Sequence, residues 1–110
     1  MKKIYAFDFD GTLCKEAYPN IGRPNKAMIH LAKRLKQHGH KLILWTCRCG
    51  PSLEEAVSWC HSQGITFDAI NSNLPETLQK YGTDSRKITA DFYIDDKGIG
   101  KFPILLSLFL

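Results

Sequence analysis

Two aspartates one residue apart, Asp8 and Asp10, follow the first apolar segment of the chain and are themselves followed by Gly11-Thr12. If the apolar segment is a β-strand, side chains at positions i and i+2 point the same way. Two carboxylates held that close repel each other unless a cation or a proton lies between them. The spacing therefore predicts a metal-assisted site at the end of this strand.

Other polar side chains end the later apolar segments. Thr46 ends the second segment, Asp95 and Asp96 end the last one, and Lys87 lies between them. Aspartate oxygens are hard ligands that suit Mg²⁺, and a bound Mg²⁺ attracts phosphate. One carboxylate can then attack phosphorus while a second moves a proton, and a hydroxyl and an ammonium group can hold the phosphoryl oxygens. The set as a whole indicates phosphoryl-transfer chemistry.

Alternating strand-like and helix-like segments must position these side chains. Strands are predicted over residues 3–9, 41–46, 65–70 and 92–94. Helices are predicted from start and stop signals: Pro24 to Gly39, Ser52 (in a capping box with Glu55) to Gly64, and Pro75 to Gly82. This order predicts an α/β, Rossmann-like three-layer domain with a mostly parallel central sheet. Ligands of such sheets bind beyond the carboxyl ends of the strands.

Length and composition limit the function classes. The 110 residues suit one domain, over 1–110, and the net charge of +4 suits an anionic substrate without being a nucleic-acid footprint. We find no apolar stretch long enough for a signal peptide or a membrane span, so we expect a cytoplasmic protein with reduced cysteines. A zinc site built from Cys47, Cys49, Cys60 and His61 is the minor alternative to plain buried thiols.

Four segments resemble the motifs of the haloacid dehalogenase (HAD) superfamily. Asp8-Phe9-Asp10-Gly11-Thr12-Leu13 resembles the first motif, and Leu42-Ile43-Leu44-Trp45-Thr46 resembles the second. Lys87 stands where the lysine of the third motif falls, and Tyr93-Ile94-Asp95-Asp96 resembles the fourth. The four occur in the order of the family over residues 4–96.

The resemblance implies a Mg²⁺-dependent phosphomonoester hydrolase (a phosphatase) with an aspartyl-phosphate intermediate. Asp8 would be the nucleophile and a metal ligand, and Asp10 the general acid/base, with its backbone carbonyl also on the metal. Thr46 would bind the phosphoryl group, and Lys87 would steady its charge. Asp95 and Asp96 would complete the metal site.

Substrate contacts are expected from Thr46, Cys47, Arg48 and Lys87, although for Arg48 a surface salt bridge is an equal alternative. Asn71 and Asn73 follow the third predicted strand, where they either line the same rim or are plain loop residues. Trp45 and Trp59 are expected to pack in or near the core rather than to bind substrate.

Neither gap between the motifs has room for the cap domain that many relatives carry, so the chain resembles the capless class. An uncapped site admits a large or macromolecular phosphorylated substrate, nucleic-acid ends included, with the loop over 14–23 as a candidate lid. The substrate and the oligomeric state stay open.

Two other functions use related residue types. A phosphate- or metal-binding regulatory module would use the same residue types, but in response-regulator receivers the phosphorylated aspartate comes later than the acidic pair. A Mg²⁺-dependent nuclease or primase-type domain usually has a glutamate on its first strand, where this chain has Lys2, Lys3 and Ile4.

Overall fold

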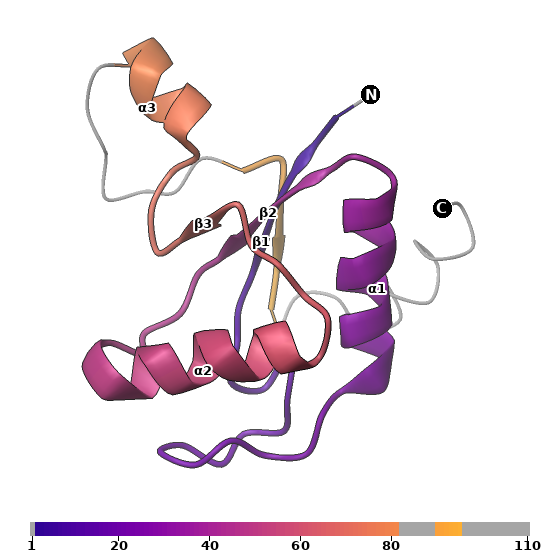
Figure 1. The fold of residues 1–110 in the computed structure, drawn as a ribbon, viewed down its shortest axis with the longest axis vertical. Coiled ribbons are helices and arrows are strands. Elements are labelled where there is room, and N and C mark those ends of the chain that lie inside the picture. Colours follow the sequence, from indigo (N-terminus) through magenta and orange to yellow (C-terminus); the bar gives the residue numbers. More distant parts are fainter. Residues whose placement is uncertain (1, 82–89, 96–110) are drawn as a thin grey trace.

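A four-stranded, all-parallel sheet forms the centre of the molecule (Figure 1). The computed structural model describes residues 2–81 and 90–95. The strands are β1 (Ile4–Phe7), β2 (Lys41–Leu44), β3 (Ala69–Ile70) and β4 (Phe92–Ile94), in the spatial order β3-β2-β1-β4. The predicted α/β fold with a parallel sheet is thereby confirmed.

β4 has the predicted bounds, whereas β1, β2 and β3 are shorter than their apolar patterns predict. β1 ends at Phe7, so Asp8 and Asp10 lie in the segment after the strand, and β3 has two residues where six were expected. Pairing continues a little beyond the named strands, since the Trp45 N–H donates to the Phe7 carbonyl at 2.8 Å. The difference arises because a hydrophobic run marks burial, whereas a strand also needs a partner at each position.

Helix α1 (Lys26–Gln37) begins two residues after the predicted start at Pro24. Asn25 is the N-cap, and its side-chain oxygen accepts a hydrogen bond from the Met28 N–H at 3.3 Å. A cap of this kind satisfies a backbone donor that Pro24 cannot satisfy, so the asparagine sets the boundary. Gly39, with φ of 85°, follows the helix as expected.

Helix α2 (Gly50–Ser62) begins before the predicted capping box, which is not formed. Cys49 is the N-cap residue, without a side-chain cap, and the Ser52 hydroxyl donates to the Cys49 carbonyl at 2.9 Å. Pro51 fits the first turn because its fixed φ is helical and it needs no partner for an N–H. The short helix α3 (Pro75–Tyr81) agrees with the prediction.

The main core lies between one face of the sheet and helices α1 and α2. Fully buried members come from β1, β2, both helices and the segment after β1: Phe7, Phe9, Leu13, Leu31, Ala32, Leu35, Leu42, Leu44, Ala56 and Cys60. The opposite face carries a smaller cluster of Ala6, Ile43 and Leu74, the residue before α3. Among the described residues the third layer of the predicted sandwich is therefore incomplete.

Asp68, which the sequence analysis did not single out, ties this core together at one edge. Its carboxylate accepts hydrogen bonds from the Lys36 ammonium group at 2.6 Å and from the Leu42 N–H at 2.8 Å. One side chain thus joins the end of α1 to β2 at the entrance to β3.

The strand order creates a change of direction between β1 and β4. From β1 the chain moves outward through β2 to β3, and it then returns to pair β4 with the other edge of β1. Across residues 2–81 and 90–95, no helix has the length and apolar character to cross a membrane.

Candidate active site at the carboxyl ends of β1, β2 and β4

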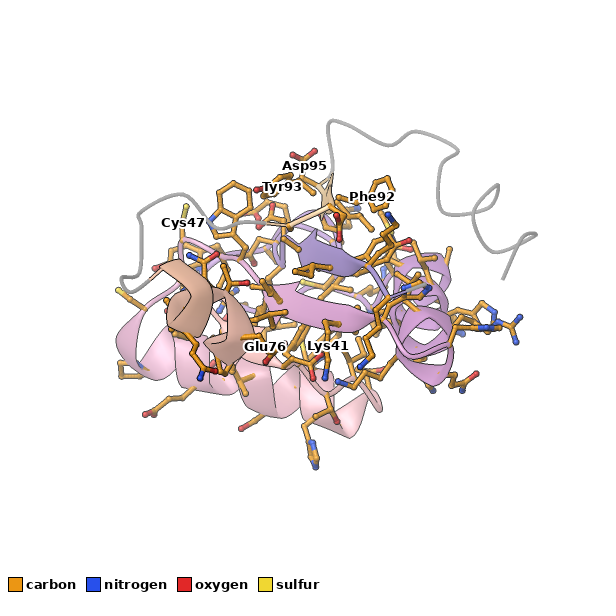
Figure 2. The ribbon with its side chains drawn as sticks, turned by 90° about the horizontal axis from the view of Figure 1, so that it is seen from above. Lys41, Cys47, Glu76, Phe92, Tyr93 and Asp95 are labelled. Atoms are coloured by element: carbon orange, nitrogen blue, oxygen red, sulfur yellow. The ribbon has the colours of Figure 1, made fainter. Side chains whose placement is uncertain are left out.

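A cavity of about 280 Å³ opens where β1, β2 and β4 end, next to the change of direction in the sheet. Crevices at such a switch point are where open parallel sheets bind ligands. The lining residues come from the ends of the three strands: Asp8, Trp45, Thr46, Cys47, Tyr93, Ile94 and Asp95. In Figure 2, Cys47, Tyr93 and Asp95 lie on the side of the ribbon away from α2.

Asp8, which lines this cavity, is held in place by backbone hydrogen bonds. Its N–H donates to the Ile94 carbonyl at 2.9 Å, which fixes the end of β1 against β4. Its Oδ1 accepts from the Phe9 N–H at 2.8 Å. The Asp8 side chain is half-buried, so its carboxylate is held in one orientation and is still accessible from the cavity.

Thr46 is positioned by Asn71, which follows β3. The Thr46 N–H donates to Asn71 Oδ1 at 2.7 Å, and Asn71 Nδ2 donates to the Arg48 carbonyl at 3.4 Å. Asn71 has φ of 51°, a left-handed conformation that asparagine tolerates better than most residues. Asn71 therefore stabilises the turn after β2. The sequence analysis predicted either a rim residue or a plain loop asparagine at this position.

A second hollow, of about 460 Å³, meets the first cavity at Asp8, Thr46 and Cys47. Its remaining lining residues come from the segment after β1 and from the turn after β2: Asp10, Glu16, Tyr18 and Arg48. Asp8 and Asp10 thus face one shared space, as their spacing predicts.

Arg48 is buried, with 2% of its surface exposed, and pairs with Asp10 through two hydrogen bonds of 2.8 Å. Its guanidinium group also donates to the Pro19 carbonyl at 3.3 Å and the Asn20 carbonyl at 2.9 Å. The hydrogen bonds with Asp10 raise the pKa of Arg48, against the lowering effect of burial.

These contacts change the role expected for Arg48. A surface salt bridge does not describe it, because the residue is buried and its donors are engaged by Asp10 and by the loop at 19–20. A substrate contact stays a prediction, since Arg48 also lines the second hollow. The guanidinium carbon also lies 5.0 Å from the centroids of the Phe9 and Tyr18 rings. Arg48 therefore positions Asp10 and stabilises the loop over 14–23, which is the candidate lid.

Asp8 and Asp95 supply a donor set that fits Mg²⁺. Both are carboxylates that line one cavity, and Mg²⁺ is typically held by one or two carboxylates, waters and the phosphate of its substrate. Within residues 2–81 and 90–95, no group of three or more His, Cys, Asp or Glu side chains gathers to hold a metal ion. A Mg²⁺ site here would thus be completed by waters and substrate oxygens.

The alternative zinc site is not formed. Cys60 is fully buried in the core while Cys47 and Cys49 are exposed, and burial raises the pKa of Cys60 to about 12. Zinc binds the thiolate, which such a pKa disfavours.

Several predicted residues lie elsewhere. Lys87 and Asp96 fall outside the described residues. Asn73 is buried, with 3% of its surface exposed, and does not line either hollow. Trp59 packs edge-on against Phe9, as expected, whereas Trp45 is not core: 44% of its surface is exposed, at the first cavity.

Sequence reasoning missed Tyr93 as a lining residue. Its signal lay in strand alternation: Ile94 is buried, so its neighbour points to the opposite face of the sheet. Alternation shows that the two side chains point to opposite faces of the sheet. It does not show which of the two faces the helices cover.

One solved structure is similar over nearly the whole chain. It is described as the structure of a conserved protein from Bacteroides thetaiotaomicron, and it matches with a TM-score of 0.83 and 38% sequence identity. The match covers 99% of this chain and 90% of the other. No protein-family model and no curated protein matches the chain.

Proposed function

We propose that this chain, which belongs to the same family as the conserved Bacteroides thetaiotaomicron protein, is a Mg²⁺-dependent phosphomonoester hydrolase acting through an aspartyl-phosphate on Asp8. One observation carries the proposal: Asp8, Thr46 and Asp95 come from three strand ends and line a single cavity. The resemblance of the four ordered motifs to the HAD superfamily supports the same reaction. The fold of a capless HAD domain is part of the proposal.

In the first step, an Asp8 carboxylate oxygen attacks phosphorus, and the bond from phosphorus to the ester oxygen breaks. Asp10 gives the leaving oxygen a proton, and the Thr46 hydroxyl donates to a phosphoryl oxygen. Bound Mg²⁺, held by Asp8, the Asp10 backbone carbonyl and Asp95, would offset the negative charge of the phosphoryl group.

In the second step, water attacks the phosphorus of the aspartyl-phosphate and passes a proton back to Asp10. The bond from phosphorus to the Asp8 oxygen breaks, which releases inorganic phosphate and restores both aspartates. Arg48 occupies one acceptor site on each Asp10 oxygen. Because a carboxylate has about four such sites, acceptor capacity remains for this proton.

The proposal is tested by Asp8→Asn in an assay of phenyl phosphate and ethyl phosphate with excess Mg²⁺. We expect hydrolysis to fall by about a thousand-fold or more, because the amide is not a nucleophile. Glu76→Gln is the control, since Glu76 is an exposed carboxylate on α3 that does not line either hollow (Figure 2).

Wild-type turnover in Asp8→Asn would rule out the mechanism. Lasting, stoichiometric phosphorylation of Asp8 by acetyl phosphate, without turnover, would instead support the alternative of a regulatory module.

A further inference from the structure

Two aromatic rings stand exposed beside the proposed nucleophile. Trp45 is 44% exposed and Tyr93 is 37% exposed, although large aromatic side chains gain most by burial. Their ring centroids lie 5.4 Å apart with an interplanar angle of 63°. Both rings line the cavity of about 280 Å³ that also contains Asp8 and Thr46.

The sheet itself places the rings on this side. In β2, Leu42 and Leu44 face the helices, so Ile43 and the following Trp45 belong to the opposite face. In β4, Tyr93 likewise alternates with the buried Ile94. Both rings therefore lie on the face of the sheet opposite to helices α1 and α2.

Strand pairing places Tyr93, because it is the register partner of Ala6 of β1. The Tyr93 ring is also held in place, since the Ala90 N–H donates to its hydroxyl oxygen at 3.3 Å.

The contact between the rings leaves apolar surface accessible. An edge-to-face arrangement uses one face of one ring, and the exposed fractions show that both rings keep open surface. Another exposed aromatic, Tyr18, lines the second hollow rather than this cavity, and its ring contacts Arg48. A flat apolar group next to a phosphate at Asp8 would therefore meet Trp45 and Tyr93.

Building on the proposed hydrolase activity, we propose that Trp45 and Tyr93 form an aromatic platform for the leaving group. The substrate is then a phosphomonoester whose leaving group carries a planar ring, either an aryl group or a nucleobase. Stacking on aromatic side chains discriminates such substrates from alkyl phosphates, which offer no flat surface.

The test compares ring-bearing and alkyl substrates in wild type and in Trp45→Ala. We expect kcat/KM for phenyl phosphate and for a nucleoside 5′-monophosphate to exceed that for ethyl phosphate. In Trp45→Ala the ratio of ring to ethyl substrate falls by about ten-fold, the effect of losing one stacking surface. The larger drop for either phenyl phosphate or the nucleotide identifies which kind of ring the platform fits.

Phe92→Leu is the matched control. Phe92 is 40% exposed and adjoins Tyr93 on β4, but its ring stacks on Tyr5, with centroids 4.9 Å apart, on the helix-facing side of the sheet. Its substitution should leave the ratio of ring to ethyl substrate as in wild type. Urea unfolding midpoints confirm that each variant is folded before its kinetics are compared.

A binding measurement separates this inference from the proposed activity. In the Asp8→Asn background, calorimetry should give a Kd for phenyl phosphate that Trp45→Ala weakens by about ten-fold, while the Kd for inorganic phosphate changes far less. If Trp45→Ala changes neither the ratio of ring to ethyl substrate nor the Kd for phenyl phosphate, the platform is overturned, even if the enzyme is an active phosphatase. If binding depends on Trp45 but no hydrolysis occurs, the platform is supported and the proposed function is overturned. If the protein shows no binding and no hydrolysis, both proposals are overturned.

Discussion

The pair of Asp10 and Arg48 is the most tightly organised feature at the scale of single residues. A buried guanidinium group with two hydrogen bonds to one carboxylate holds that carboxylate in a single orientation. The same group reaches the carbonyls of Pro19 and Asn20, so the proposed acid/base and the neighbouring loop share one anchor. Arg48 therefore contributes to the site through Asp10, whose two carboxylate oxygens it binds, and through the loop at 19–20.

We predict that Arg48→Met, which keeps the length of the side chain and removes its donors, lowers the free energy of unfolding by about 3–5 kcal/mol. The loss arises because the largely buried Asp10 carboxylate loses its charged partner and the Pro19 and Asn20 carbonyls lose their donor. Urea denaturation provides the measurement, and Arg23→Met, at an exposed arginine, should change stability by about 0.5 kcal/mol or less.

A double-mutant cycle with Asp10→Asn tests the coupling. The two single losses should sum to more than the loss in the double variant, because either change alone breaks the same contact. Additive losses would show that the pair contributes nothing as a pair.

At the scale of elements, Asp68 decides how α1, β2 and β3 are joined. Burial raises the pKa of Asp68, but the hydrogen bonds from Lys36 and the Leu42 N–H, with the charges of Lys36 and Lys41, outweigh it and lower the pKa below its ordinary value of 3.8. A carboxyl group with a lowered pKa in the folded state stabilises the fold when it is ionised.

We predict that Asp68→Asn lowers the free energy of unfolding by about 1–2 kcal/mol at pH 7. Because the folded-state pKa is lowered, the difference from wild type should be full above the unfolded-state value near 3.8 and shrink as pH falls through the folded-state pKa below it. Chemical denaturation between pH 7 and pH 3 measures this, with Glu54→Gln, an exposed acid on α2, as the control.

A pH-independent difference between wild type and Asp68→Asn would contradict the assignment. It would mean that the side chain acts through packing or its amide-compatible hydrogen bonds rather than through its charge.

At the scale of the whole molecule, the strand order brings the chemistry together. Because β4 pairs with the free edge of β1, Asp95 reaches the cavity that contains Asp8, although 87 positions separate them in the chain. Two carboxylates at one cavity repel each other unless a cation is present. Mg²⁺ should therefore act on the stability of the fold as well as on activity.

We predict that Mg²⁺ at about ten times its Kd stabilises the fold by about 1.4 kcal/mol and raises Tm by several degrees. Chelation should reverse the shift. Thermal unfolding followed by circular dichroism measures it, with Asp95→Asn expected to lose most of the shift and Glu76→Gln to keep it. An equal shift in wild type and Asp95→Asn would place the ion elsewhere.

Much of the architecture follows from local sequence. The periods of hydrophobic residues and the glycines at 39 and 64 predict the order of strands and helices, because burial patterns and left-handed turns are properties of short segments. The segment boundaries at Pro24 and Ser52 were wrong, since Asn25 and Pro51 compete for the helix starts. The spacing of Asp8 and Asp10 likewise predicts that both acids face one space.

Only the tertiary structure decided what surrounds those acids. Strand pairing across long separations brought Asp95 beside Asp8, buried Arg48 against Asp10, and left Trp45 and Tyr93 exposed at the cavity. A sequence pattern reports what each segment prefers by itself. Which edge of β1 receives β4, and which face the helices cover, depend on the free energy of packing the whole chain, and no short segment contains that information.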